Sequence, residues 1–150
     1  MEPMQEKSAE QAAIVVAAKE IAARALATKE QSEKELAAKR AEYPVIDGGV
    51  TDEIHQSWKA QNGHVMIVDV YDDFIKEHHV AYFRRPSMET MDAVNTVSKN
   101  SSELKGADTM FKNCWLGGSP MVQSDAILKT AALGSLGNMF ANCHAELKNL

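Results

Sequence analysis

The stretch HVMIVDVYDDFIKEHHVAYFR, residues 64–84, predicts a β-hairpin and decides the fold class. Residues 64–70 and 79–84 are rich in β-branched and aromatic side chains, which favour extended strands. The residues between them are mostly polar and turn-like, so we expect an antiparallel pair. Because an isolated hairpin is marginally stable, the strands must pack on helices or join a sheet shared between subunits. An unpaired strand edge favours self-association, so we expect a homo-oligomer.

The N-terminal part of the chain predicts one long helix. Residues 9–42 contain no glycine or proline and hold twelve alanines, interleaved with Glu, Lys and Arg. Alanine has the highest helix propensity, and pairs such as Glu20 and Arg24 place an acid four residues before a base, which is the favoured order. At about 1.5 Å per residue such a helix extends about 50 Å, which exceeds the width of a small domain.

This helix has few large apolar side chains. Lys29 and Ser32 interrupt its richest apolar stripe, so the pattern does not predict a leucine zipper. Small side chains let another helix approach closely but bury little area. We therefore expect an arm whose first half docks on a neighbouring protein through Val15, Ala18 and Ala22, and whose second half is solvated.

The predicted fold class is α+β, with a long N-terminal helix, a short helix, the antiparallel hairpin and three further helices. We divide the chain into an arm of residues 1–44 and a domain of residues 45–150. Residues 43–50, YPVIDGGV, are expected to form a linker or turn. Thr51 is expected to cap the short helix, which ends at Asn62-Gly63, and Ser87 is expected to cap a helix of residues 88–99. A helix of residues 102–116 is expected to end at Gly117-Gly118. Ser124 is expected to cap a last helix, whose apolar face contains Ile127, Leu133, Leu136, Phe140, Cys143 and Leu147.

The two cysteines, Cys114 and Cys143, are expected to be buried structural thiols. Cys114 follows Met110 by four residues and Cys143 precedes Leu147 by four, so both lie on apolar helical faces. A nucleophilic cysteine needs a base or a helix N-terminus to lower the pKa of its thiol, whereas Cys114 lies near a predicted helix C-terminus. The pattern therefore predicts no catalytic residue.

Composition and spacing argue against several ligand classes. The net charge of -5 disfavours general nucleic-acid binding, which depends on Lys and Arg neutralising phosphates. No apolar run approaches the ~20 residues that span a bilayer. The adjacent pairs His78-His79 and Cys143-His144 point their side chains apart, so they predict no zinc site. We expect no cofactor, no metal, no nucleic acid and no membrane partner.

Two segments of the second half carry a resemblance to a known family. AYFRRPSMETM, residues 81–91, ends a strand in an aromatic and basic element before a proline, and NCWLGGSPMVQSDAIL, residues 113–128, leads from a tryptophan-containing turn into an apolar helix. With these motifs, residues 54–150 resemble small morphogenesis proteins of tailed bacteriophages, of the tail-assembly-chaperone type. The alanine-rich arm is not part of this pattern.

The resemblance implies a non-enzymatic protein that binds other phage proteins, such as the tape measure, the tail tube or the capsid. It implies a location in the bacterial host cytoplasm during assembly, or in the virion. By motif position the partner-binding residues would be Tyr82, Phe83, Arg84, Arg85 and Pro86, together with Trp115, Leu116, Gly117 and Gly118. Two alternatives stay open: a structural virion component, capsid or tail subunit, whose N-terminal helix clasps its neighbours, and a small ligand-binding domain or enzyme of unknown chemistry.

Overall fold

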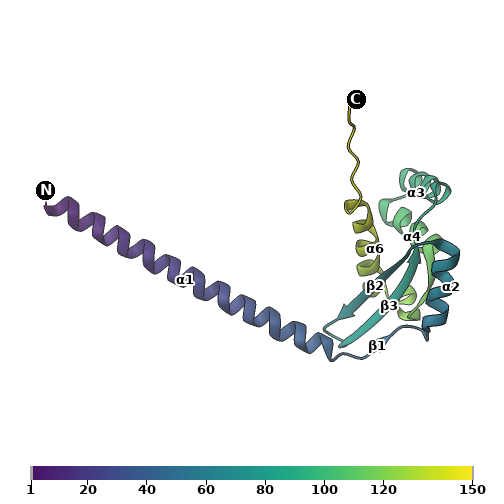
Figure 1. Cartoon of the computed structure of the whole chain (residues 1–150), viewed down its shortest axis with the longest axis horizontal. Helices are drawn as coiled ribbons and strands as arrows, with labels where there is room; N and C mark the ends of the chain where they lie inside the picture. Colours follow the sequence, from purple (N-terminus) through teal and green to yellow (C-terminus); the bar gives the residue numbers. More distant parts are fainter. Residues whose placement is uncertain (1, 150) are drawn as a thin grey trace. The chain divides into compact units, whose positions relative to one another are not determined.

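The computed structural model describes residues 2–149, with their side chains from residue 8 onward. The chain divides into two units, Met1–Glu42 and Tyr43–Leu150, and the second is called the domain below. The described residues form six helices and a mixed sheet of four strands, so the fold is α+β (Figure 1).

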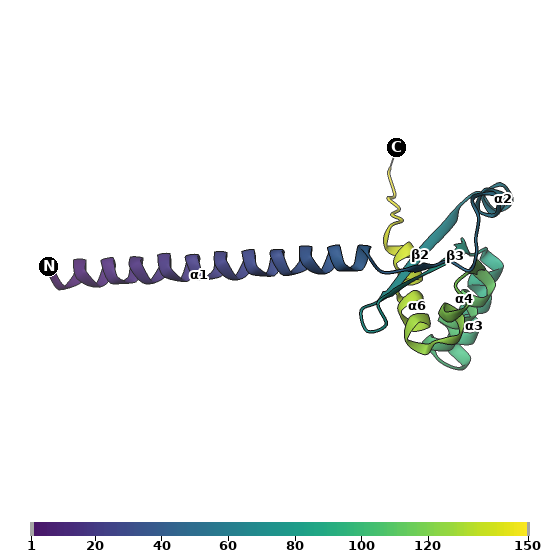
Figure 2. The same cartoon turned by 90° about the horizontal axis from the view of Figure 1, so that it is seen from below.

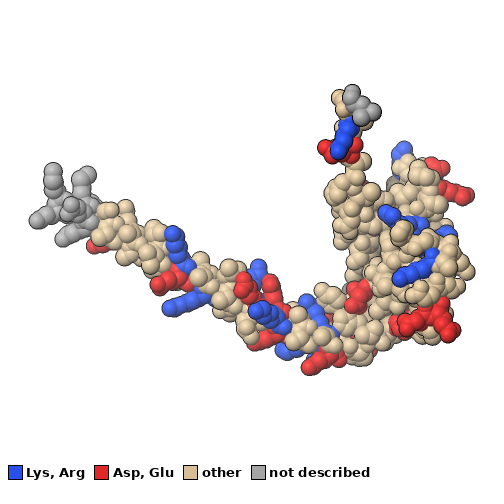
Figure 3. Space-filling view, viewed as in Figure 1, with Lys and Arg blue, Asp and Glu red and all other residues tan. Residues whose placement is uncertain are grey.

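The first unit is one helix, α1, Glu2–Ala41, as its alanine content predicts. From residue 8 to residue 41 every side chain is exposed except Leu36 and Arg40, which are half-buried. Basic and acidic side chains are interspersed along its described part, as Figure 3 shows. Helix formation in this unit therefore depends on local propensity and surface charge pairs, because the helix buries almost none of its own side chains.

Strand β3, Glu77–Arg84, is central to the sheet. On one edge it pairs antiparallel with β2, Val65–Asp72, from Val65 opposite Arg84 to Asp72 opposite Glu77. The predicted hairpin is therefore confirmed, and each strand extends two residues further into the turn than expected. Lys76 in that turn has a φ of 55°, and the Asp72 carboxylate accepts a hydrogen bond from the Phe74 amide.

Two further strands were not predicted. β1, Val45–Ile46, pairs in parallel with β3 inside the segment expected to be a linker. β4, Trp115–Gly118, pairs antiparallel with β3, whereas Gly117-Gly118 were expected to end a helix. Both strands are short, and their pairing partner is distant in sequence, so no local pattern marks them.

The two faces of the hairpin differ in burial, as the alternation of a strand requires. Val68 and Val70 of β2 are buried with Phe83 of β3, while Ile67 and Tyr71 point to the opposite, exposed face. Helix α6, Ala126–Ala141, packs along β2 on the buried face (Figures 1 and 2).

Four helices of the domain begin at side-chain caps. Thr51 caps α2, Asp52–Asn62; Ser87 caps α3, Met88–Asn100; Ser102 caps α4, Glu103–Cys114; and Asp125 caps α6. The caps at Thr51 and Ser87 were predicted, as was the end of α2 at Gly63. Ser124 was the wrong cap, because it closes the short helix α5, Pro120–Ser124, and Asp125 begins α6.

The apolar face predicted for the last helix is largely wrong. Leu128, Ala132 and Leu136 are its buried residues. Ile127 is 73% exposed, and Cys143 lies beyond the end of the helix in an exposed segment. Because α6 carries apolar side chains around most of its circumference, periodicity does not identify the face that meets the sheet. By contrast, Met110, Phe111 and Cys114 of α4 are buried as expected.

Candidate functional site

The pairing of β3 with β4 joins the two segments that carry the family resemblance. Tyr82 lies opposite Gly117 and Phe83 opposite Trp115, with a register shift between the two pairs. The structure therefore brings both predicted partner-binding segments together on one edge of β3. Leu116, between them, is half-buried.

Part of this predicted set belongs to the core. The Phe83 ring centroid lies 5.2 Å from that of Phe111 and 5.5 Å from that of Trp115, in edge-on contacts. Phe83 has no exposed surface. A side chain without exposed surface offers nothing to a partner, so Phe83 stabilises the domain. Trp115 is half-buried and reaches the surface in part.

The two glycines of β4 permit close approach of neighbouring segments. A Cβ on Gly117 would lie 2.7 Å from the Trp58 indole of α2. Gly118 has a φ of 134°, and a Cβ there would overlap the Val80 carbonyl oxygen. α2 thus packs over part of the sheet face opposite α6, and the ring centroids of Trp58 and Tyr82 lie 5.5 Å apart. Burial, followed by the charges of Asp47 and Asp52, raises the pKa of the Tyr82 hydroxyl.

Cys114 lies in the core beside this strand pair and is fully buried. Burial raises the pKa of its thiol, and the nearby Arg84 charge acts in the opposite direction. The thiol is therefore protonated at neutral pH, which disfavours nucleophilic chemistry. Arg84 donates a hydrogen bond from Nε to the Asn113 carbonyl oxygen at 3.0 Å, so this arginine ties the end of β3 to the end of α4.

Arg85 and Pro86 lie on a surface groove beside the end of α6. The groove has a volume of about 420 Å³ and is lined by Arg85, Pro86, Met91, Met139, Phe140 and Cys143. We call it the methionine groove. Phe140 is 48% exposed, and methionine side chains adapt to irregular apolar surfaces. Of the predicted partner-binding residues in the domain, this pair therefore has the most suitable surroundings for a protein segment.

A second groove follows the edge of β2 that does not pair with β3. Its volume is about 390 Å³, and its lining includes Met66 to Asp69 of β2 with Leu136 and Met139 of α6. We call it the β2-edge groove. β2 is a terminal strand of the sheet, and an uncovered strand edge can pair with an added strand. Met139 lines both grooves, so the two adjoin at α6.

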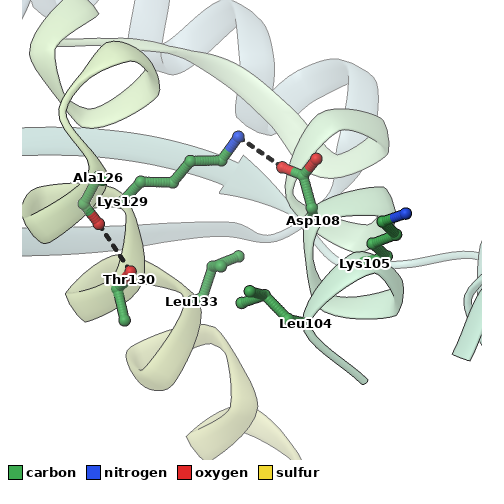
Figure 4. Close-up of a pocket in the computed structure, with 7 residues that line it drawn as sticks. All are labelled: Leu104, Lys105, Asp108, Ala126, Lys129, Thr130 and Leu133. Carbon is green, nitrogen blue, oxygen red and sulfur yellow. Dashed lines mark hydrogen bonds and ion pairs between the residues drawn. The ribbon is translucent and has the colours of Figure 1, made fainter. Parts of the chain in front are cut away.

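A third cavity lies between α4 and α6 and has a volume of about 280 Å³ (Figure 4). Leu104 and Leu133 form its apolar part. Lys129 Nζ lies 2.5 Å from Asp108 Oδ1, and Lys112 Nζ lies 3.0 Å from Oδ2. The hydrogen bond from Lys129 is the main cause of a lowered pKa at the Asp108 carboxyl, with Lys112 contributing. These charges pair with one another, so we interpret the cavity as a space between two helices that the ion pairs hold together.

A buried polar cluster joins β3 to the start of α5. The His79 ring places Nδ1 2.7 Å from Ser119 Oγ and Nε2 2.8 Å from Glu77 Oε2. A neutral imidazole with its proton on Nε2 donates to Glu77 and accepts from the Ser119 hydroxyl. His79 and Ser119 have no exposed surface, so a substrate cannot reach the hydroxyl and the cluster acts as a structural tie.

The sequence analysis missed this cluster, because it considered the His78-His79 pair only as a possible zinc site. Strand alternation could have revealed it, because His79 shares its face with Ala81 and Phe83, both buried. Ser119 carried no signal, since its pairing depends on β4.

The predicted contact residues on α1 are all on its surface. Val15 is 52% exposed, and Ala18 and Ala22 are exposed. Their side chains are therefore accessible to a partner along the first half of the helix.

Comparison with protein-family models, with curated proteins and with solved structures gives no match. Among residues 2–149, no group of three or more His, Cys, Asp or Glu side chains is arranged to hold a metal ion. Within the same part of the chain, no helix combines the length and the apolar character needed to cross a membrane.

Proposed function

We propose that this protein is a non-enzymatic assembly protein that acts by binding other proteins through α1 and the grooves of the domain. The observation that carries the proposal is the exposure of large apolar side chains on α1. Ile14 is 67%, Val15 52% and Ile21 68% exposed. Covering such side chains removes apolar area from water, at about 25 cal/mol per Å², so a docked partner is favoured.

The two adjoining grooves of the domain support the same function. Their linings combine methionines with an exposed aromatic ring and a free strand edge. A flexible apolar lining accepts protein segments of differing sequence, and a strand edge supplies backbone hydrogen bonds to an extended segment. Partners of the class that the resemblance implies, a tape measure or tail-tube protein of a tailed bacteriophage, fit this description.

Deletion of residues 1–42 tests the proposal. All the buried hydrophobic residues of the core lie between Val68 and Leu136, so the shortened chain should keep the thermal unfolding transition of the domain. It should lose co-purification with phage structural proteins when expressed during assembly. A shortened chain that binds the same proteins as the full chain would contradict the proposal, and one that is unfolded would show that α1 belongs to the core.

A second candidate function is that of a structural virion component whose helix clasps neighbouring subunits. The 40-residue helix α1, most of whose side chains are exposed from residue 8 onward, favours it, because such a helix is longer than a small domain is wide. Mass spectrometry of purified particles separates the two. The chain is present in many copies per particle if it is a subunit, and it is absent if it acts only during assembly.

A further inference from the structure

α1 carries a heptad seam that differs from the stripe of Val15, Ala18 and Ala22. Its successive seam positions are Gln11, Ile14, Ala18, Ile21, Ala25 and Thr28, and none is charged. Ile14 and Ile21 are the two most exposed large apolar residues of α1. Spacing of three and four residues is that of a two-stranded coiled coil, in which small residues allow the helix axes to approach closely.

We propose that two copies of this chain pair through this seam as antiparallel helices. The inference rests on the proposed function only in taking α1 as the contact element. The charges beside the seam decide the orientation, because flanking residues of a coiled coil face one another across the interface.

A parallel pair would be opposed by its charges. Arg24 precedes the seam residue Ala25, and Lys29 follows the seam residue Thr28. In a parallel arrangement the residue before the seam on one helix faces the residue after the seam on the other, five positions further along. Arg24 would therefore face Lys29 of the second copy twice, and like charges at this separation repel.

An antiparallel pair instead places Arg24 opposite an acidic residue of the second copy. With Ile14 packed on Ala18 of the second copy, Ile21 lies against Gln11, and each isoleucine meets a smaller or more flexible residue. Glu10 then faces Arg24 of the second copy, and the symmetry of the pair produces this contact twice. The two-fold axis crosses the interface at the level of residue 16 along each helix.

Charge reversal in the full-length chain tests the orientation by sedimentation equilibrium. Because two attractive pairs become repulsive, Glu10→Arg and Arg24→Glu should each raise the dimer dissociation constant about tenfold. The double variant Glu10→Arg/Arg24→Glu should return it close to the wild-type value. Lys19→Glu, a reversal on the outer face, is the matched control and should leave the constant unchanged.

A matched pair of substitutions tests the seam. Ala18→Glu places a charge in the interface, whereas Ala23→Glu places the same charge on the opposite side of the helix. The two have the same helix propensity, and circular dichroism should show equal helix content. Dimerisation should be lost only in Ala18→Glu.

Spin labels give an independent measure of orientation. In a Cys143→Ser background, buried Cys114 is not labelled, so a cysteine introduced at Ala17 or Glu30 carries the only label. Labels at position 17, which flanks the seam and faces its own copy in this register, should lie close together in the dimer. Labels at position 30 should lie about 40 Å apart, since each is displaced by about 1.5 Å per residue in opposite directions from the axis.

Several results would overturn the inference. They are a monomer from micromolar to millimolar concentration, tighter association of Arg24→Glu, or equal losses in Ala18→Glu and Ala23→Glu. A higher oligomer would also overturn it. If the full-length chain is a monomer but deletion of residues 1–42 still abolishes phage-protein binding, only the pairing is contradicted. If binding is unchanged after that deletion, the proposed function is contradicted.

Discussion

α1 and the domain use their apolar residues in opposite ways. Ile14 and Ile21 of α1 are more than 60% exposed, whereas Phe83, Phe111 and Leu128 of the domain are at most 2% exposed. α1 becomes helical through local propensity, while the domain depends on contacts between segments far apart in the chain. The comparison indicates that stability and partner binding occupy different parts of this protein.

The largest effect is expected from Phe83→Ala. Removing this ring leaves a cavity beside Phe111 and Trp115, and the free energy of unfolding should fall by about 3–5 kcal/mol. Ile21→Ala, the counterpart in α1, should change it by less than about 0.5 kcal/mol. Urea denaturation followed by tryptophan fluorescence measures both. Equal losses in the two variants would remove the contrast between the units.

The next effect concerns the glycines within the domain. Gly118→Ala requires a side chain at a φ of 134° and against the Val80 carbonyl, so it should lower the free energy of unfolding by about 2 kcal/mol or more. Gly134→Ala is the control, because a Cβ there meets nothing within 4 Å on the surface of α6. It should raise stability by about 0.5–1 kcal/mol through helix propensity. Thermal melts of both variants give the two signs.

The two cysteines sharpen the comparison at smaller magnitude. Cys114→Ala should cost about 1–2 kcal/mol through lost packing, and Cys143→Ala less than about 0.5 kcal/mol. In the native protein an alkylating reagent should modify exposed Cys143 quickly and buried Cys114 only on unfolding. Fast modification at Cys114, read by peptide mass spectrometry, would contradict its place in the core.

The smallest effect is expected at the ion pair between α4 and α6. The folded pKa of Asp108 lies below its ordinary value of 3.8, so the carboxylate stabilises the fold above that pH. This contribution is lost as the pH falls through the lowered folded value. Asp108→Asn should therefore cost about 1 kcal/mol or less at pH 7 and nothing below the folded value. Asp92→Asn, on the exposed surface of α3, is the control, and a cost at Asp108 that persists in acid would contradict the pairing.

Local features of the sequence were sufficient for several elements. The alanine-rich run predicted α1, the alternating β-branched residues predicted the hairpin, and Thr51 and Ser87 marked helix starts. In each case the signal depends on residues within a few positions of one another, where propensity and capping act.

Other features depended on contacts that no local pattern contains. Trp115 to Gly118 are a strand because β3 offers a pairing edge, although the preceding residues are helical. The buried side of α6 is decided by the sheet it meets, since apolar residues surround most of that helix. The same holds for His79, whose two polar partners come from different elements.

The sequence alone determined most of the helices, the two strands of the hairpin, where several of these elements begin, and that α1 bears exposed apolar side chains, because these properties follow from neighbours along one chain. Only the tertiary structure decided that residues 81–83 and 115–118 lie on adjacent strands, that Phe83 is core while Arg85 lines a groove, and that Cys143 is exposed. Burial and strand pairing depend on which surfaces meet. That choice minimises the free energy of the whole domain and is not encoded at any single position.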